Sequence, residues 1–507
     1  MTIVAFETYV SGLGVATNPT GPELVPIVQG GAPKQVTVAS LIGNEQTAAE
    51  IAAGVTPVNY AYAQGVVQRY GLLDDNATDN GSKITTLVTL AQAGIALYWP
   101  KLTTGIYLTS TPLLFAGNIT MTGDAGVRIK LTAAASYVVK VDSSAVGPGY
   151  SHGGMMADLI LDGNGFATDG LYLRNVVSAN YYRIRATNVT QAGLHLAWGQ
   201  LCVFDTFICS NNVETFTTTP QYGILIDNAN SGGSSSANTF INPTAEGITS
   251  GSGIGIFAQW AIDSVFINGT SEGNKIGMVI GAIGTSDGSH NTVIGMDMES
   301  NTVQDMQIYG PSNTVLAPSF YSAFPLLISG TGAAENRVIG GTVSSVSFGA
   351  GSGANSVTDT SLSGVGASIT DAGTYNAWRG IYAGVAGAFI PDQTVRRRQN
   401  YVLSATGSVS IDLSVCSYAS VTFTGSATST ITFNAPTNAT DGVSIDINVQ
   451  NSGTGALTLA WVSGAGGWSV AGIVVPATGH NRNYRFLYNP YIGSFELASM
   501  SPADIPG

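Results

Sequence analysis

Apolar and polar positions repeat in a two-strand pattern between Gly170 and about Gly364. The first strand usually begins with Gly and carries two apolar residues separated by a variable one; it reads GLYL at Gly170, GLHL at Gly193, GILI at Gly223, GIGI at Gly253, GMVI at Gly277 and DMQI at Asp305. The second usually begins with Asn; it reads NTFI at Asn238, SVFI at Ser264, NTVI at Asn291, NTVL at Asn313, NRVI at Asn336 and NSVT at Asn355. Second strands start 26, 27, 22, 23 and 19 residues apart. Repeats of this length made of short strands predict a β-solenoid.

Side chains of the first strand alternate between two kinds. One set is apolar throughout and is expected to fill the interior of the stack: Leu171, Leu173, Leu194, Leu196, Ile224, Ile226, Ile254, Ile256, Met278 and Ile280. The other set mixes rings, charges and amides and is expected to face outward: Tyr172, Arg174, His195, Asp227, Phe257, Gln307 and Tyr309.

Composition supports an all-β fold. The 507 residues include 64 Gly and only 10% charged residues, which suits short strands joined by tight turns. The net charge of −13 argues against a nucleic-acid partner. No apolar run approaches the ~18 residues of a membrane span, and no signal peptide is recognisable, so we expect synthesis in a cytoplasm. Cys202, Cys209 and Cys416 are expected to be reduced, packed thiols.

The pattern divides the chain into four segments. Residues 1–55 are too short to fold alone and are expected to be an attachment module, and residues 56–104 a linker with a helix in which Ser82 is the N-cap and Ile84, Leu87, Val88 and Ala91 recur at helical spacing. Residues 105–380 are expected to form the stack, whose open end the helix covers. In residues 381–507 alternating strands such as SVSIDLS and TITFNA predict a separate antiparallel sandwich or barrel.

Three stretches carry a family resemblance. The segment from Arg69 through LLDDNATDN, ALYWP and GIYLTS is similar to the start of the pectate-lyase-like, right-handed β-helix of bacteriophage tailspikes. The opening ATNPTGPELVPIVQGGAPKQVTV resembles the virion-anchoring head of phage tail fibres and spikes, and the final ALTLAWVSGAGGW and YRFLYNPYIGSFEL resemble their terminal β-rich domains. The family's aspartate-rich opening is here diluted with Asn and Thr, and its Pro-x-Gly-x-Tyr turn is stretched between Pro100 and Tyr107.

This resemblance implies a right-handed parallel β-helix in a homotrimer. Such a protein would be attached to the phage tail or baseplate by its N-terminus and would act from the virion at the bacterial cell surface, after synthesis in the host cytoplasm. Its partner would be a bacterial surface polysaccharide, capsule or O-antigen, which it recognises and often cleaves. The C-terminal segment would then serve trimerisation or carbohydrate binding.

Alignment of the repeats on one another places three glutamates at one position. Glu246, Glu272 and Glu299 each lie eight residues after the start of their second strand, and Thr244, Thr270 and Asp297 lie two residues earlier on the same expected outer face. Neighbouring rungs of a parallel stack are ~4.8 Å apart, so the carboxylates would repel one another, and Glu272, in the centre, is the best candidate for a protonated general acid.

The function of this acidic column has several interpretations. Adjacent carboxyls at roughly 5 Å suit a retaining glycosidase, and Glu246 with Glu299 at ~9.6 Å approaches an inverting pair; the spacing does not choose between them. The glutamates could instead bind turn amides or lie at a trimer interface. Arg174, Arg183 and Arg185 keep a polysaccharide lyase open, because a lyase needs a cation to neutralise a uronate. A non-enzymatic receptor-binding spike is the remaining alternative, and a purely structural fibre is disfavoured by the outward mixture of acids and rings.

The outward rings and polar groups predict a sugar-binding face. Aromatic rings beside carboxylates and amides suit sugars, which present a C–H face and hydroxyls. The expected substrate-binding residues are Tyr172, Arg174, His195, Trp198, Phe257, Trp260 and Tyr309, and Asp227 and Asp297 complete the catalytic candidates. Surface or trimer contacts would use the same kinds of side chain.

The remaining patterns predict structure more than chemistry. The Asn column at the start of the second strands is expected to bond from rung to rung and to the turn backbone. His152, His195, His290 and His480 are too scattered for a zinc site, and no His-x-x-x-His or Cys-x-x-Cys spacing occurs. No metal and no cofactor is therefore predicted.

Overall fold

The computed structural model forms two compact units, Met1–Lys275 and Ile276–Gly507. The residues that it describes are 24–29, 32–37, 46–117, 119–146, 151–228, 233–283, 287–322, 324, 326–363, 369–373, 376–379, 381–383, 388–390, 398–411, 418–437, 444–463, 467–470, 473–489, 494–501 and 505–506. No helix in these ranges is long and apolar enough to cross a membrane.

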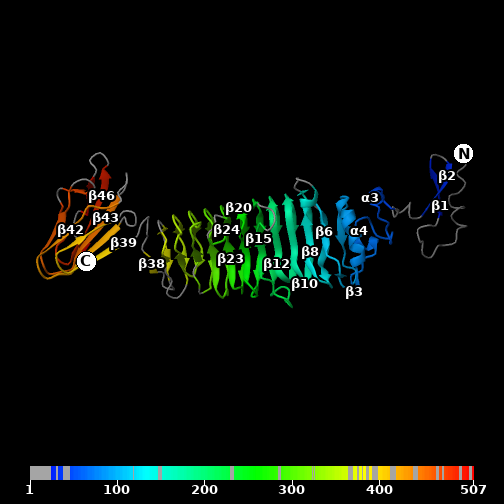
Figure 1. The fold of residues 1–507 in the computed structure, drawn as a ribbon, viewed down its shortest axis with the longest axis horizontal. Helices are drawn as coiled ribbons and strands as arrows, with labels where there is room; N and C mark the ends of the chain where they lie inside the picture. Colours follow the sequence, from blue (N-terminus) through cyan, green and yellow to red (C-terminus); the bar gives the residue numbers. More distant parts are fainter. Residues whose placement is uncertain are drawn as a thin grey trace. The chain divides into compact units, whose positions relative to one another are not determined.

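The first unit begins with short elements (Figure 1). They are the antiparallel hairpin β1 (Leu24–Gln29) and β2 (Ala32–Thr37), then α3 (Ala48–Ala52), the 3₁₀ turn η1 (Val67–Tyr70), β3 (Asp75–Asp79), α4 (Gly81–Gln92), β4 (Leu97–Trp99), β5 (Ile106–Thr109), β6 (Leu113–Phe115), β7 (Thr120–Leu131), β8 (Ala135–Asp142), η2 (Ser143–Val146) and β9 (Ser151–His152). The regular rungs follow as β10 (Met155–Val177), β11 (Asn180–Tyr182), β12 (Arg185–Gln200), β13 (Val203–Asp205), β14 (Ile208–Ser210), β15 (Tyr222–Ile226), β16 (Ser235–Ser236), β17 (Thr239–Ile241), β18 (Thr244–Glu246), β19 (Ile254–Ala258), β20 (Ala261–Ile262), β21 (Val265–Ile267) and β22 (Thr270–Glu272).

These rungs stack in parallel as a right-handed β-helix. Sheet A contains β11, β13, β17 and β21; sheet B contains β14, β18 and β22; sheet C contains β15 and β19. The long strands β10 and β12 run through more than one sheet, because β12 pairs with β14 at Arg185 and with β15 from Ala192 to Leu196. The predicted β-helix is confirmed.

Two bends in each rung use the left-handed backbone conformation. At the bend between sheets A and B, φ is 60° at Thr206, 49° at Asn242 and 51° at Asn268. The bend that leads into sheet A has φ of 55° at Leu201 and 54° at Ala237. Asn tolerates this conformation better than most residues, whereas Leu, Thr and Ala adopt it at a cost of about 1 kcal/mol each, which the surrounding rungs must offset.

The interior is filled by columns of like side chains. On sheet A the rings of Tyr181, Phe204, Phe240 and Phe266 stack with centroid separations of 4.9, 4.7 and 4.7 Å and interplanar angles of 5–9°. The ten apolar residues predicted to face inward on the first strand are all buried. Cys202 and Cys209 are buried free thiols, as predicted, and burial raises the pKa of Cys202 to about 11; Cys416 lies outside the described residues.

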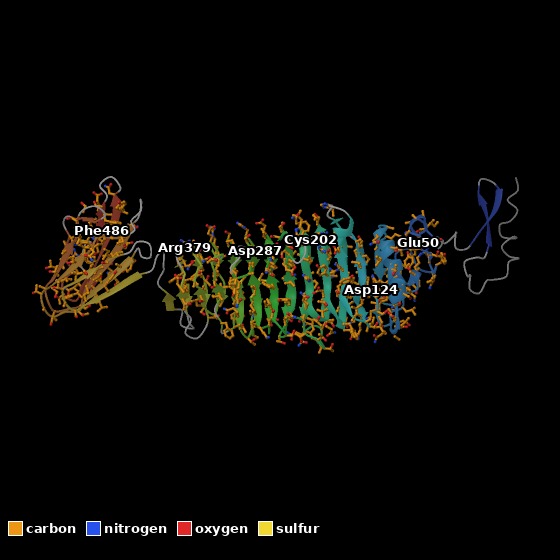
Figure 2. The ribbon with its side chains drawn as sticks, viewed as in Figure 1. Glu50, Asp124, Cys202, Asp287, Arg379 and Phe486 are labelled. Atoms are coloured by element: carbon orange, nitrogen blue, oxygen red, sulfur yellow. The ribbon has the colours of Figure 1, made fainter. Side chains whose placement is uncertain are left out.

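The N-terminal end of this stack is closed by the two helices and a buried ion pair (Figure 2, Glu50). Glu50, fully buried, accepts hydrogen bonds from Arg69 Nε at 2.7 Å and from the Tyr70 hydroxyl at 2.6 Å. Burial alone would raise the pKa of Glu50, but the hydrogen bonds from Arg69, Tyr70 and the Thr47 N–H lower it to about 2. This pair fastens α3 to η1.

The helix α4 corrects one detail of the sequence analysis. It buries Ile84, Leu87 and Ala91 as predicted, but its N-cap is Asn80, so the assignment of Ser82 as the cap was wrong. The Asn80 side chain does not cap the helix, because its Oδ1 accepts from the Leu73 N–H at 2.9 Å and its Nδ2 donates to the carbonyls of Leu73 and Leu108.

The second unit continues the same two-strand repeat. Its strands are β23 (Ile276–Ile280), β24 (Thr292–Ile294), β25 (Asp297–Met298), β26 (Gln304–Ile308), β27 (Thr314–Leu316), β28 (Ser319–Phe320), β29 (Leu326–Ile328), β30 (Arg337–Ile339), β31 (Thr342–Val343), β32 (Val346–Phe348), β33 (Ser356–Thr358), β34 (Ser361–Leu362), β35 (Ile369–Asp371), β36 (Ala377–Arg379), β37 (Ile381–Ala383) and β38 (Ala388–Ile390). Except for the antiparallel pair β37–β38, neighbouring rungs pair in parallel.

The predicted asparagine ladder runs through the described rungs of this unit. Asn291, Asn313, Asn336, Asn355 and Asn376 are at most 1% exposed. Each backbone N–H of the first four donates to the side-chain oxygen of the next member at 2.8–3.1 Å, and the side-chain amides bond in the same direction at 3.0–3.2 Å. The ladder therefore satisfies buried turn amides from rung to rung.

The C-terminal strands form two sheets, one of mixed direction and one parallel. They are β39 (Arg398–Leu403), β40 (Gly407–Val409), β41 (Tyr418–Phe423), β42 (Ser429–Phe433), β43 (Ser444–Asn451), β44 (Leu457–Trp461), β45 (Trp468–Ser469), β46 (His480–Asn489), β47 (Ser494–Met500) and β48 (Ile505–Pro506). The predicted antiparallel pairing occurs at β43–β46–β47, whereas β39–β41–β43 and β40–β42–β44 are parallel. From β39 to β44 successive strands alternate between the two sheets, so β39, β41 and β43 run the same way in one sheet, as β40, β42 and β44 do in the other. Both sheets share one apolar core that includes Phe433, Trp468 and Phe486.

Candidate functional site

Two of the predicted glutamates are neighbours on sheet B. Glu246 ends β18 and Glu272 ends β22, and the two residues are direct register partners. Both side chains are half-buried, while Ala245 and Ser271 before them are fully buried. Register partners on parallel strands project to the same side about 5 Å apart. The pair therefore lies on the outer face, with interior residues beneath it.

Two other predicted carboxylates lie on or just after β25. Glu299 and Asp297 belong to the second unit, where β25 pairs with β28 and places Tyr321 in the rung after Glu299. Glu299 is exposed. Asp297 Oδ1 is buried without a hydrogen-bond partner among the described residues.

Glu246 is held from the side opposite Glu272. Its Oε2 accepts a hydrogen bond from the Ser210 hydroxyl, and Asn212 Nδ2 donates to the same oxygen at 3.3 Å. Ser210, the register partner of Glu246 on β14, is 1% exposed. Sequence comparison of the rungs missed this contact, because the rung of Ser210 lacks the Asn that marks the later second strands.

The connection from β14 to β15, residues 211–221, is a long loop fastened across the earlier rungs. Glu214 accepts from Arg128 Nη2 at 2.5 Å and from Arg185 Nη1 at 3.4 Å. The N–H groups of Thr217 and Thr218 donate to the side-chain oxygen of Asn188 at 2.6 and 3.4 Å. These bonds span 29–86 residues in sequence and fix the loop beside the glutamate pair.

Most of the predicted binding residues gather on sheet C instead. Its outer row contains Lys140, Tyr172, His195, Leu225 and Phe257, which are register partners on successive strands from β8 to β19. Tyr222, which the sequence analysis did not single out, stacks on Phe257 with centroids 5.7 Å apart. The apolar Leu225 separates this aromatic pair from His195.

His195 lies between two carboxylates. Its Nδ1 is 3.0 Å from Asp169 Oδ2 and its Nε2 is 3.1 Å from Asp227 Oδ1. Burial alone would lower the pKa of His195, but the bonds and attraction to both aspartates raise it to about 9. Burial raises the pKa of Asp169, which is 4% exposed. At neutral pH the imidazolium thus bridges a buried and a more exposed aspartate and orients Asp227.

Other members of this row already have partners. Lys140 Nζ lies 4.7 Å from the centroid of the Tyr172 ring, whose other neighbour is the edge-on imidazole of His195 at 4.6 Å. Arg174 Nη1 is 3.7 Å from Asp142, which Lys140 also contacts at 2.9 Å.

The remaining predicted rings differ in exposure. Trp198 is only 6% exposed, and the backbone at Gly233 packs against its indole. Trp260 and Phe257 are half-buried. Tyr309 belongs to the second unit, donates to Gln307 at 3.0 Å and has a pKa raised by burial.

The structure thus gathers the predicted residues of the first unit into two groups. Sheet B holds the pair Glu246 and Glu272, and sheet C holds the rings, cations and Asp227. Sequence reasoning missed Ser210, Lys140, Asp169 and Tyr222. Asp169 had one available signal, since it directly precedes the Gly170 that opens a rung. Among the described residues no cluster of His, Cys, Asp and Glu could hold a metal ion.

These features define a right-handed parallel β-helix protein with an outward acidic pair on one sheet and an aromatic, charged row on the next. No protein-family model matches the chain, and no curated protein sequence matches it. Several solved structures are similar in fold. Gene product 12 of bacteriophage phi29, in its pre-mature form, has 13% identity and a TM-score of 0.46 over 73% of this chain and 64% of that chain. The match therefore spans less than two thirds of the phi29 chain.

Two phage tailspikes and a bacterial adhesin are similar in fold to this chain to about the same degree. The gp42 tailspike of Acinetobacter phage vb_AbaP_AS12 has 11% identity and a TM-score of 0.41, covering 87% of this chain and 82% of that chain. The Dettilon tailspike protein gp208 has 12% identity and a TM-score of 0.40, covering 83% and 76%. PfbA, a surface adhesin of Streptococcus pneumoniae, has 10% identity and a TM-score of 0.40, covering 86% and 98%.

Proposed function

We propose that this protein is a phage tailspike that binds a bacterial surface polysaccharide and hydrolyses it with Glu246 and Glu272. The observation that carries the proposal is the direct register of these two half-buried carboxyls on β18 and β22. Their expected separation of about 5 Å is that of a retaining glycosidase. The virion attachment, the homotrimer and the bacterial glycan as partner rest on the sequence resemblance to tailspikes.

The reaction would proceed in two displacements. An oxygen of Glu246 attacks the anomeric carbon while the bond to the glycosidic oxygen breaks; that oxygen keeps the electron pair and takes the proton of Glu272. Water then attacks the glycosyl ester and gives a proton to Glu272, and the electron pair of the breaking ester bond returns to Glu246. The product keeps the anomeric configuration of the substrate.

The sheet C residues would supply binding in this scheme. The pair of Tyr222 and Phe257 offers partly exposed rings, and Asp227, oriented by His195, offers a fixed acceptor for sugar hydroxyls. Lyase chemistry has weaker support, because its candidate cations are already in ion pairs. Arg183 bonds to Asp158 at 2.6 and 2.7 Å, and Arg185 and Arg174 contact Glu214 and Asp142.

The test is oligosaccharide release from capsular polysaccharide and lipopolysaccharide of candidate hosts, followed by mass spectrometry and proton NMR. The parent protein should release fragments with retained anomeric configuration. Glu246→Gln and Glu272→Gln should lose at least about 100-fold in rate, while Glu335→Gln, the same change at an exposed rung position, should not.

Three outcomes would contradict the proposal in different ways. Fragments that end in an unsaturated uronate would assign a lyase. Inverted product together with loss of activity in Glu299→Gln would move the chemistry to a wider carboxyl pair. Tight binding without fragments would make the protein a non-enzymatic receptor-binding spike.

A further inference from the structure

Ser210 is a buried hydroxyl beside the glutamate pair that the two-carboxylate mechanism leaves without a role. It ends β14, is 1% exposed and is the register partner of Glu246. Glu246 therefore has Ser210 in the rung on one side and Glu272 in the rung on the other. Because Ser210 is almost fully covered, it does not reach a polysaccharide itself.

The direction of the hydrogen bond between Ser210 and Glu246 follows from the number of hydrogens and lone pairs on the Ser210 hydroxyl. A serine hydroxyl has one hydrogen to donate and two lone pairs to accept with. The backbone N–H groups of Asn212 and Val213 donate to Ser210 Oγ at 3.1 and 3.2 Å, and these two bonds occupy the lone pairs. The hydroxyl hydrogen is then left for Glu246 Oε2, its remaining partner.

This arrangement makes Glu246 Oε2 an acceptor. Asn212 Nδ2, which has only hydrogens to offer, donates to the same oxygen at 3.3 Å. Both bonds therefore favour the carboxylate form of Glu246 and go to one oxygen. Among the described residues no side chain donates to Oε1, so the second oxygen is the one that can reach a sugar.

The loop that supplies these donors is itself fixed. The Asn211 N–H donates to the Glu246 carbonyl at 3.0 Å, and the Glu214 N–H donates to the Ser210 carbonyl at 3.0 Å. The ion pairs of Glu214 with Arg128 and Arg185 hold the far side of the turn. The Ser210 hydroxyl is thus pre-oriented, and it costs no further ordering when substrate binds.

We propose that Ser210 is a positioning residue that holds Glu246 as the ionised nucleophile of the glutamate pair, with Glu272 as the acid. The proposal rests on the proposed hydrolysis and adds the assignment of roles. It predicts that Ser210 affects the chemical step and has little effect on substrate binding.

The experiment compares the steady-state kcat and KM for polysaccharide cleavage by the parent protein, Ser210→Ala and Asn212→Ala. Loss of a hydrogen bond to a charged group should lower kcat about 10- to 100-fold for Ser210→Ala, with KM within about threefold of the parent. Asn212→Ala should lower kcat in the same way but by less, because its bond to Glu246 is longer. Glu214→Gln is the matched control, since it weakens the anchor of the loop and keeps both donors.

Azide, added as a small external nucleophile to the alanine variants of the two glutamates, tests which of them is the nucleophile and which is the acid. Glu272→Ala should yield a glycosyl azide of retained configuration, because Glu246 still forms the glycosyl ester that azide opens. Glu246→Ala should yield an inverted glycosyl azide, because azide then attacks the substrate directly. The reverse pattern overturns the assignment.

The outcomes separate this inference from the function on which it rests. A parent protein that releases no fragments refutes the hydrolysis and the role of Ser210 with it. An active parent with an unchanged kcat in Ser210→Ala overturns the inference alone. Equal losses of kcat in Ser210→Ala and Glu214→Gln would also overturn it, because they would show that only the fixed loop matters.

Discussion

Truncation of one ladder asparagine, Asn313→Ala, should destabilise the second unit strongly. The Asn313 side-chain oxygen accepts from the backbone and side-chain N–H of Asn291 at 2.9 and 3.0 Å. Its amide donates to the carbonyls of Gly288 at 2.9 Å and Gly310 at 3.1 Å, and to Asn336 at 3.2 Å. All these residues are buried.

The magnitude follows from the groups that lose a partner. The Asn291 backbone N–H and the carbonyls of Gly288 and Gly310 are three buried backbone groups, and a buried unsatisfied group costs about 1–3 kcal/mol. We therefore expect the free energy of unfolding to fall by at least about 3 kcal/mol. In Asn313→Ser the free energy of unfolding should fall by about half as much, since Ser264 shows that a serine at the ladder position accepts from one N–H and donates to one carbonyl.

The assay is guanidinium unfolding of the full chain, followed by circular dichroism and tryptophan fluorescence. Thr314→Ala, the next residue on β27 and only half-buried, is the control and should stay within about 1 kcal/mol of the parent. A loss below about 1 kcal/mol in Asn313→Ala, or a serine variant less stable than the alanine variant, would refute the hydrogen-bond accounting.

Three further changes test the first unit. The raised pKa of His195 implies a contribution to stability that is fully present below about pH 6.5 and is lost as pH rises through about 9. Over this window the free energy of unfolding should fall by up to about 3 kcal/mol in the parent but not in His195→Gln, as measured by urea unfolding at each pH. Glu50→Gln should lower the free energy of unfolding by about 3–5 kcal/mol, because it leaves the Arg69 charge buried without its partner; an unchanged thermal melt would contradict this. In the parent, the contribution of Glu50 to stability should be lost as pH falls from about 4.5 towards about 2. Phe240→Ala should lower the free energy of unfolding by about 3–5 kcal/mol, since the fully buried ring stacks on the rings of both neighbouring rungs. Phe166 is 45% exposed, and Phe166→Ala should lower the melting temperature little. Similar shifts in the two variants would argue against the stack as a source of stability.

The regular rungs could be predicted from sequence because each rung repeats the same local rules. Alternating apolar positions indicated the interior, the Asn column indicated the ladder, and counting from that column put Glu246 beside Glu272. Each of these inferences needs only strand parity and the spacing of one rung to the next.

Long-range side-chain contacts could not be predicted in this way. Glu214 meets Arg128 across 86 residues, and no periodicity relates the two. Asn80 Oδ1 accepts from the Leu73 N–H and its Nδ2 donates to the Leu108 carbonyl, 28 residues away. The helix therefore has no side-chain cap, although the local pattern suggested one at Ser82. The C-terminal strands alternate correctly in sequence, but alternation does not specify which strands become neighbours or in which direction they run.

The corner between sheets B and C admits connections of very different length. Residues 211–221 join β14 to β15, whereas residues 247–253 join β18 to β19, and the paired strands keep the same register in both rungs. A rung therefore tolerates insertion at this corner without change to its neighbours. Exchange of segment 211–221 for a connection of another length would alter the surface beside the glutamate pair while the paired strands of the scaffold stay in place, so this corner separates the variable surface from the constant core.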